Sequence, residues 1–163
     1  MTYANVINES VKDYKPGSEE RKTLLKEYKR QSNEKIEIPI IIGGKKIYSD
    51  KVGHCVSPHN HKKVLATFYK ADEKIVNSAI ENSLETWKSW SSTSLSYRTN
   101  IFRKAAKLLA EKWRDKINAA TMLNQSKNVY QAEIDAACEL IDFFNFNSSF
   151  AENIYSTQNL ISP

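Results

Sequence analysis

The sequence places its most informative acidic side chains in one stretch, from Tyr130 to Asn147. This stretch contains no Gly or Pro and is rich in helix-forming residues, which predicts one long helix. Asp135, Glu139 and Asp142 are spaced i, i+4, i+7, so such a helix would carry three carboxylates on one narrow strip. Aromatic residues flank the strip, and carboxylates in such surroundings need water, a partner or a ligand. The strip is therefore the first candidate for chemistry.

The same predicted helix is apolar on nearly every side, which is typical of a helix buried between other elements. A domain of 163 residues cannot cover all of its aromatic rings, so we expect part of this surface to be exposed. An exposed apolar patch of this kind marks an interface or an aggregation liability. The rings concerned are Phe143, Phe144, Phe146 and Phe150.

A second group of side chains superficially suggests a metal site. His54, Cys55, His59 and His61 lie within eight positions of one another. Their spacing fits no standard zinc pattern, and ligands on one short extended segment do not converge easily on one ion. We therefore interpret the segment as a polar turn with surface histidines and predict no metal site.

The groups that a nicotinamide-dependent enzyme requires are missing from the sequence. Its four glycines, at positions 17, 43, 44 and 53, form no G-x-G-x-x-G motif for a pyrophosphate. Cys138 is expected to be a small core residue, and no Lys, Arg or His lies near it in the sequence to activate its thiol. We therefore predict no catalytic and no cofactor-binding residue in this chain.

Charge is distributed unevenly along the chain. The net charge is +5, but residues 132–163 carry five acids and no base. No Arg-rich or Gly–aromatic tract accompanies the basic residues, so we expect no nucleic-acid partner. No apolar run has transmembrane length, and the first residues resemble neither a signal nor a transit peptide. With two cysteines only, we expect a reducing compartment, either the cytoplasm or the mitochondrial matrix.

The chain in order predicts an α+β fold, treated as one partial domain over residues 1–163. Residues 1–17 form an extended arm closed by Pro16-Gly17, and residues 18–70 contain a helix capped by Ser18, a hairpin and a strand. Gly43-Gly44 between β-branched runs predicts the hairpin turn, and the strand is expected over residues 64–69.

The remaining residues, 71–163, are predicted to be helical. Asp72 caps the first helix of this part, and residues 91–94 interrupt the pattern. Ser96 is expected to cap the next helix, a separate helix starts at Asp115, and the last one extends to about Tyr155. The expected total is a cluster of four or five helices.

Several of these segments resemble one family. QAEIDAACELIDFFNFN, preceded by INAATMLNQSKNVY, is similar to the N-terminal region of the delta-1-pyrroline-5-carboxylate dehydrogenases (L-glutamate gamma-semialdehyde dehydrogenases). That family belongs to the aldehyde dehydrogenase superfamily. IPIIIGGK matches the family's hairpin, and a helix pair follows the superfamily pattern Ala79, Trp87, Trp90, Arg98, Ala105-Ala106 and Leu109. At Ser126 the wider superfamily often has glycine.

The resemblance implies a fold and an activity. The chain would form the first layer of an aldehyde dehydrogenase cofactor domain without its Rossmann-type sheet. The parent enzyme would oxidise L-glutamate gamma-semialdehyde to L-glutamate with NAD in proline degradation, and would be a homo-oligomer. The residues matching the family's nucleophile, base and cofactor contacts would lie beyond Pro163, so the isolated chain is expected to be an inactive fragment that binds no NAD by itself. Its partner would be the remainder of the dehydrogenase, in the same or a separate chain.

Glu139 is the one substrate-binding residue that the resemblance implies. The helix would run beside the aldehyde tunnel, with Glu139 near the α-ammonium group of the substrate, where a low dielectric strengthens the attraction. The alternative is that Glu139 makes a structural hydrogen bond or ion pair.

A second function also stays open. The chain would then be a small helical interaction module without enzymatic activity, whose apolar surface binds another protein.

Overall fold

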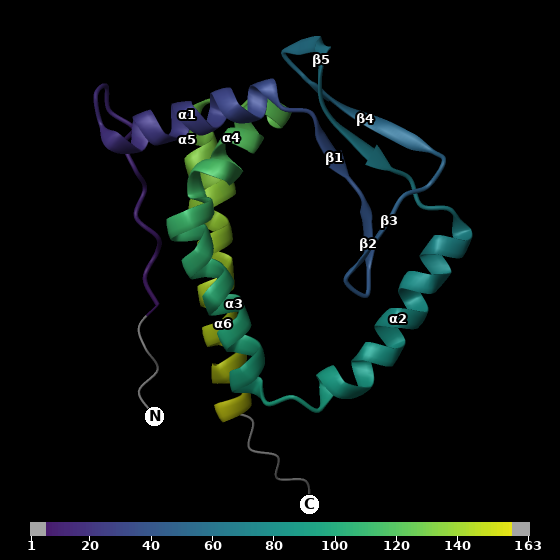
Figure 1. The fold of residues 1–163 in the computed structure, drawn as a ribbon. Coiled ribbons are helices and arrows are strands. Elements are labelled where there is room, and N and C mark those ends of the chain that lie inside the picture. Colours follow the sequence, from purple (N-terminus) through teal and green to yellow (C-terminus); the bar gives the residue numbers. More distant parts are fainter. Residues whose placement is uncertain (1–5, 158–163) are drawn as a thin grey trace, which may run out of the picture.

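Helices and small sheets surround a central opening in the chain (Figure 1). The computed structural model describes residues 6–157, so residues 1–5 of the predicted arm and the terminal residues 158–163 lie outside the described part. Four continuous helical rods and two small sheets make up residues 6–157, which confirms the α+β prediction. No helix in this part of the chain is long and apolar enough to cross a membrane.

Two helices begin where their capping residues predicted. Helix α1 (Glu19–Asn33) starts after Ser18, whose hydroxyl accepts a hydrogen bond from the N–H of Arg21. Helix α2 (Glu73–Ser91) starts after Asp72, whose carboxylate accepts from the N–H of Ile75 at 2.8 Å. In both helices the cap satisfies a backbone donor that has no partner inside the helix.

The predicted hairpin is confirmed as strands β2 (Ile40–Ile42) and β3 (Lys45–Ile47). Gly43 and Gly44 connect them with φ values of 56° and 75°. Both values lie in the left-handed region that this turn type requires and that glycine adopts without a steric penalty.

The predicted polar turn with surface histidines was wrong in its extent. Residues 52–69 form a second hairpin, strand β4 (Val52–Ser57) and strand β5 (Asn60–Tyr69), and the turn between them is only Pro58-His59. Exposure alternates along β4, the period-2 pattern of a half-buried strand. Val52 and Val56 lie on its exposed side, so the sequence shows no apolar–polar alternation there. Strand β1 (Ile36–Ile38) pairs with β5 in parallel, so the sheet order is β1-β5-β4.

The helix boundaries predicted at Ser96 and Asp115 were also wrong. Ser94 is the cap, and its hydroxyl accepts from the N–H of Tyr97 at 3.2 Å. Helix α3 (Leu95–Leu108) then continues through a π-helical segment, η1 (Leu109–Trp113), into helix α4 (Arg114–Gln125) without a break. No Gly or Pro lies between residues 95 and 125 to end the helix, so the chain passes through the wider π-helical turn η1 and stays helical.

The helix predicted from Tyr130 is confirmed, and it extends from Val129 to Thr157. Asn128 caps it through a reciprocal capping box with Gln131. Helix α5 (Val129–Ala132), the π-helical segment η2 (Glu133–Cys138) and helix α6 (Glu139–Thr157) follow one another without interruption. Ser126, before the cap, takes a φ of 56°, so it adopts the left-handed conformation in which glycine is usual.

These two long rods pack side by side, and α1 lies across one end of them (Figure 1). A small core of Tyr14, Leu24 and Ala119 joins α1 to α4. Helix α2 stands apart on the other side of the opening and has no buried residue. Its rings and aliphatic chains remain exposed, for example Leu84 at 63% and Trp87 at 64%.

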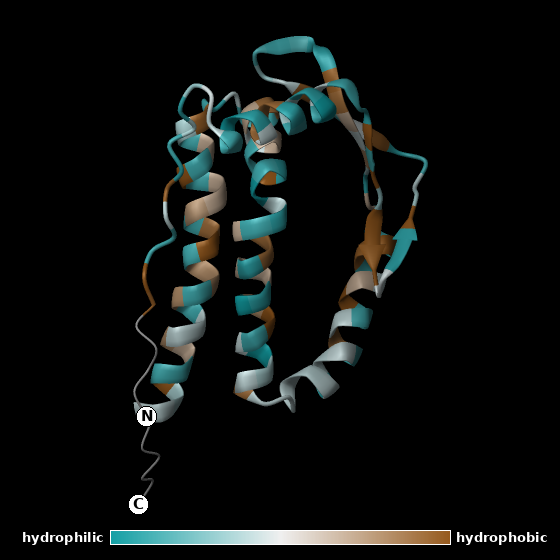
Figure 2. Ribbon diagram, turned by 60° about the vertical axis from the view of Figure 1, so that its left-hand side comes forward, coloured by the Kyte–Doolittle hydropathy of each residue, from teal (hydrophilic) through white to brown (hydrophobic). Residues whose placement is uncertain are grey.

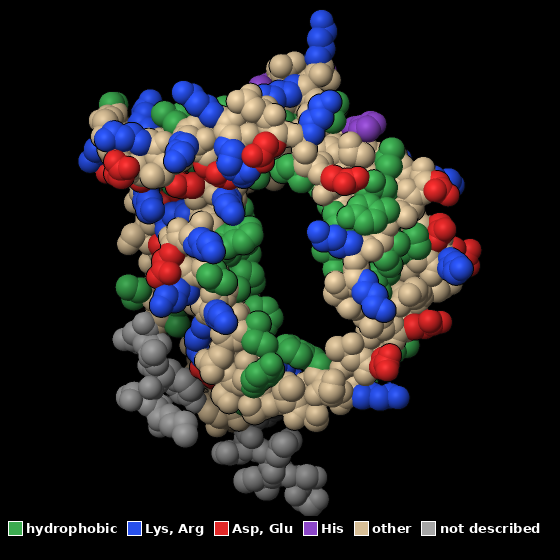
Figure 3. Space-filling model, viewed as in Figure 1, with side chains coloured by type: hydrophobic (Ala, Val, Ile, Leu, Met, Phe, Trp, Pro, Cys, Tyr) green, Lys and Arg blue, Asp and Glu red, His purple; other side chains and the backbone are tan. Residues whose placement is uncertain are grey.

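Apolar side chains border the central opening (Figure 3), and the ribbon coloured by hydropathy shows apolar positions along the long helices (Figure 2). Phe143 and Phe150 are exposed, whereas Phe144 and Phe146 are only partly buried. This confirms that residues 6–157 cannot cover the aromatic surface of α6.

The corrected start of α3 yields a paired test. Replacing Ser94 with Ala removes the acceptor of the Tyr97 N–H and is expected to lower the free energy of unfolding by about 1 kcal/mol. Ser96→Ala is the matched control, because the side chain of Ser96 contacts only the hydroxyl of Ser94. Denaturant unfolding followed by circular dichroism measures both; an equal loss in the two variants would contradict Ser94 as the cap.

Candidate functional site

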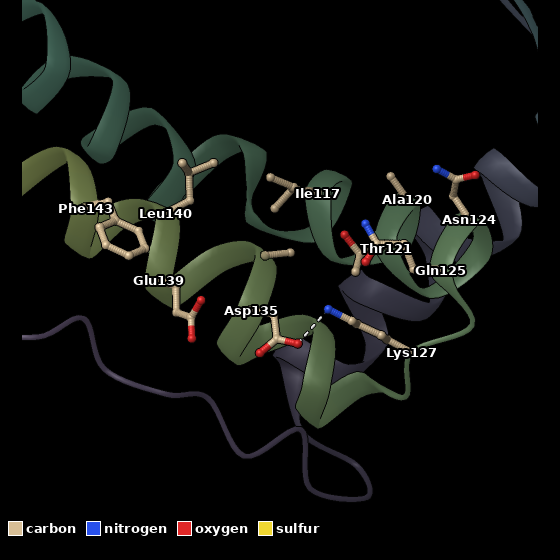
Figure 4. Close-up of a pocket in the computed structure, with 11 residues that line it drawn as sticks. Ile117, Ala120, Thr121, Asn124, Gln125, Lys127, Asp135, Glu139, Leu140 and Phe143 are labelled. Carbon is tan, nitrogen blue, oxygen red and sulfur yellow. Dashed lines mark hydrogen bonds and ion pairs between the residues drawn. The ribbon is translucent and has the colours of Figure 1, made fainter.

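The candidate site is an open groove of about 460 Å³ between α4 and the rod formed by η2 and α6 (Figure 4). One wall carries Ile117, Ala120 and Thr121 from α4, and the other carries Ala136, Leu140 and the acidic side chains discussed below. Apolar atoms dominate the walls, and polar side chains project from both of them, among them Thr121 and Asn124 on one wall and Asp135 and Glu139 on the other (Figure 4). Such a combination, an apolar trough with few polar groups, is typical of a small-ligand site.

Two of the three predicted acids line this groove. The carboxylate of Asp135 forms an ion pair with Lys127 at 2.6 Å, and both side chains are partly exposed. Glu139 lies one helical turn further along and is also exposed. Within residues 6–157 its carboxylate has no hydrogen-bond or ion-pair partner. The groove therefore carries one carboxylate that is paired with a lysine, Asp135, and one that has no partner within residues 6–157, Glu139.

Asp142 departs from the predicted strip. Its oxygens accept hydrogen bonds from the side chain of Asn8 at 2.8 Å and from the N–H of Glu9 at 2.7 Å. It therefore faces the N-terminal arm and does not line the groove. The prediction of one shared strip for all three acids was wrong in this respect, because tertiary contacts and the wide turn η2 alter the directions that regular spacing predicts.

Glu133 on η2 is a fully buried carboxylate that no sequence pattern indicated. Its exposed fraction is 0%, and Arg114 at the start of α4 is 2% exposed. The two side chains form an ion pair with an N–O distance of 2.5 Å. Asn118 donates to the same carboxylate at 2.8 Å, and the hydroxyl of Tyr14 donates at 2.8 Å. No local sequence pattern predicts this pair, because Glu133 and Arg114 are 19 residues apart in the chain and lie on two different rods.

Competing effects set the pKa of Glu133. Burial by itself would raise the pKa, since it disfavours the charged form. The hydrogen bonds that the carboxylate accepts outweigh burial and hold its pKa below the ordinary value; they come from Arg114, the N–H of Lys12, Tyr14 and Asn118. Burial and the neighbouring Glu133 carboxylate raise the pKa of Tyr14, so its hydroxyl stays a donor.

The thiol of Cys138 lies beside this pair. The Nη2 of Arg114 is 3.4 Å from its sulfur, so a cation is nearby although none is near in the sequence. Burial and the charge of Glu133 nevertheless raise the pKa of Cys138 to about 11. The thiol is therefore protonated at neutral pH, as predicted, but for a reason that only the structure supplies.

The histidine-rich hairpin shows a different arrangement. His54 contacts Thr67 across the β4–β5 pair, and His59 contacts Ser126 at 2.8 Å. Across residues 6–157, no three His, Cys, Asp or Glu side chains come together in a way that could hold a metal ion.

The chemistry of the groove lining favours the binding of a small charged ligand. Its lining residues include no Cys and no His, and the lysine that it contains is paired with Asp135. A free carboxylate above apolar walls favours a ligand that carries a cationic group on a short carbon chain.

The buried pair yields a prediction about stability. Glu133→Gln removes the fully buried one of the two carboxylates that compensate Arg114, the other being Glu9, and is expected to lower the free energy of unfolding by about 3 kcal/mol. Glu139→Gln is the control and should change it little, because Glu139 is exposed.

The same pair predicts a pH dependence. Because the folded pKa of Glu133 is lowered, its contribution is present above the unfolded pKa of about 4.3 and is lost as pH falls through the folded value. Unfolding free energies measured from about pH 6 to about pH 3 should fall less steeply in Glu133→Gln than in the native chain. Parallel curves would show that Glu133 is not the ionised partner.

Comparison with known proteins places this geometry in a family. The model of the Aldehyde dehydrogenase family matches residues 47–162. The probable delta-1-pyrroline-5-carboxylate dehydrogenase of Schizosaccharomyces pombe is 43% identical over 154 residues, which cover 94% of this chain and 28% of that protein. The mitochondrial delta-1-pyrroline-5-carboxylate dehydrogenase of Homo sapiens is 40% identical over 158 residues, which cover 97% of this chain and 28% of that protein.

A solved structure agrees with these relatives. The Delta-pyrroline-5-carboxylate dehydrogenase from Mycobacterium tuberculosis, bound with NAD, superposes on all of this chain and on 31% of its own chain. The TM-score is 0.93 and the sequence identity is 42%. The chain thus spans about three-tenths of the length of these relatives and matches the N-terminal part of their fold. It belongs to the aldehyde dehydrogenase family.

Proposed function

We propose that this chain is the N-terminal portion of an NAD-dependent dehydrogenase that oxidises L-glutamate gamma-semialdehyde to L-glutamate. The observation that carries the proposal is the superposition of the whole chain on an NAD-bound delta-pyrroline-5-carboxylate dehydrogenase with a TM-score of 0.93. Curated relatives with the same activity in their names support it.

The exposed apolar surface supports a role within a larger assembly. The opening bordered by apolar side chains (Figure 3) and the uncovered face of α2 call for further polypeptide to cover them. We propose that the remainder of the dehydrogenase, in the same or a separate chain, supplies this cover together with the NAD site, and that the complete enzyme is a homo-oligomer of the cytoplasm or the mitochondrial matrix.

Glu139 is proposed to bind the α-ammonium group of the substrate. Its exposed carboxylate has no partner within residues 6–157 and stands beside Leu140 and Phe143, which suit an aliphatic chain (Figure 4). When further polypeptide closes the groove, water is displaced and the attraction between carboxylate and ammonium becomes stronger.

The first prediction concerns the isolated chain. The 163-residue protein should form no NADH from glutamate semialdehyde, because no cysteine thiol lines its groove to attack the aldehyde. Absorbance at the NADH band measures the rate after removal of host dehydrogenases. Turnover that persists through this purification and follows the protein concentration would contradict the assignment of catalysis to another part of the enzyme.

The second prediction concerns Glu139 in the complete dehydrogenase. Glu139→Ala should raise the KM for glutamate semialdehyde by about tenfold while changing the KM for propanal less than about twofold, because propanal has no ammonium group. Glu81→Ala, which removes an exposed carboxylate of α2 away from the groove, is the matched control. Equal effects of Glu139→Ala on both aldehydes would make Glu139 a packing residue.

A further inference from the structure

The position of Glu139 depends on its helix and not on contacts of its own side chain. Within residues 6–157 its carboxylate forms no hydrogen bond or ion pair, in contrast to Asp135, which is held by Lys127. Whatever fixes the backbone of the rod at residues 133–142 therefore also fixes the Glu139 carboxylate over the groove.

Residues 8–14 of the N-terminal arm bond to side chains of that segment on both sides of Glu139. At one end, the carboxylate of Glu133 accepts from the N–H of Lys12 at 2.9 Å and from the hydroxyl of Tyr14 at 2.8 Å. At the other end, Asp142 accepts from the arm at Asn8 and at the N–H of Glu9. The arm runs along the two long rods, as Figure 1 shows.

The residue next to Glu139 also meets the arm. The sulfur of Cys138 lies 3.9 Å from the carbonyl oxygen of Ser10, a weak contact in which the thiol donates. Three positions of the rod, 133, 138 and 142, thus face the arm, while Asp135 and Glu139 face the groove.

The arm holds the opposite wall of the groove as well. Arg114, the first residue of α4, donates to the carboxylate of Glu9 at 2.6 Å and to the carbonyl oxygen of Ser10 at 2.7 Å. Ile117 and Ala120 of the same helix line the groove. Because one short segment bonds to both rods at the level where the groove begins, it restrains the spacing of the two walls.

The end of the arm is held in an unfavourable conformation. Tyr14 has a φ of 51°, a left-handed value that a bulky side chain rarely adopts, and only 3% of the residue is exposed. Such strain persists only where surrounding contacts compensate for it. The contacts of Tyr14 with Glu133 and Asn118 provide this compensation.

We infer that the arm positions Glu139: by bonding to Glu133, Cys138 and Asp142 on one side of the rod, residues 8–14 hold the Glu139 carboxylate over the groove on the other side. Its consequence for catalysis rests on the proposed function: the arm then contributes to selectivity for aldehydes that carry an ammonium group. None of the arm residues lines the groove, so they are positioning residues and not binding residues.

Asp142→Ala tests this inference in the complete dehydrogenase. The substitution removes the two hydrogen bonds that Asp142 accepts from the arm and leaves the residues that line the groove unchanged. The KM for glutamate semialdehyde should rise roughly fivefold to tenfold, and the KM for propanal less than about twofold. The matched control is Glu152→Ala on the same helix, which removes the ion pair with Arg103 and a hydrogen bond from Thr99, far from the arm. It should leave the ratio of the two KM values unchanged.

A double variant shows whether the arm acts through Glu139. In a Glu139→Ala background, Asp142→Ala should raise the KM for glutamate semialdehyde no further, since the group that the arm positions is absent. Additive effects would overturn the inference, as would an equal change of the KM ratio in Glu152→Ala.

Hydrogen exchange separates a failure of the inference from a failure of the proposed function. Backbone amides of residues 138–142 should exchange about tenfold faster in Asp142→Ala than in the native protein, and Glu152→Ala should leave them unchanged. Unchanged exchange in Asp142→Ala would overturn the inference whichever aldehyde is the substrate. A native enzyme that does not oxidise glutamate semialdehyde would overturn the proposed function instead, and with it the role in selectivity.

Discussion

The buried ion pair between Glu133 and Arg114 is the interaction on which the arrangement of the long helices depends. Both side chains are almost fully enclosed, and each would be costly to bury alone. Desolvation offsets much of the attraction between them, so the main effect of the pair is to disfavour any packing that separates the two charges. Tyr14, Asn118 and the backbone of the arm complete the hydrogen bonding, which leaves no lone pair of the carboxylate without a donor nearby.

The groove is a consequence of the same arrangement. The pair joins the start of α4 to the start of η2, and the groove lies between these two rods with apolar side chains on its walls. The wide turns η1 and η2 adjoin the pair on both rods, and wide turns of this kind occur often at functional sites. The exposed carboxylate of Glu139 is thereby carried on a helix that the buried carboxylate of Glu133 holds in place.

A large part of the remaining surface of residues 6–157 is apolar and exposed. Helix α2 carries a regular apolar face but has no buried residue, and the rings of Phe143 and Phe150 are left open to solvent. Their burial against further polypeptide would contribute substantially to stability, at roughly 25 cal/mol per Å² of apolar area. The family membership of the chain and its coverage of only 28–31% of its relatives agree with this surface being an internal interface.

Local signals in the sequence determined the elements that depend on neighbouring residues. The caps Ser18 and Asp72, the Gly43-Gly44 turn and the long helix from Tyr130 are all of this kind, because their hydrogen bonds close within a few residues. The start of α3 was missed by two residues because two serines compete there. Strand β4 was missed because its valines lie on the exposed side, so its sequence shows no apolar–polar alternation. Only the tertiary structure decided that Glu133 is buried, that Asp142 turns to the arm and that Glu139 remains free over the groove. The partners of Glu133 and Asp142 lie up to 134 residues away in the chain, and no local pattern encodes such a contact.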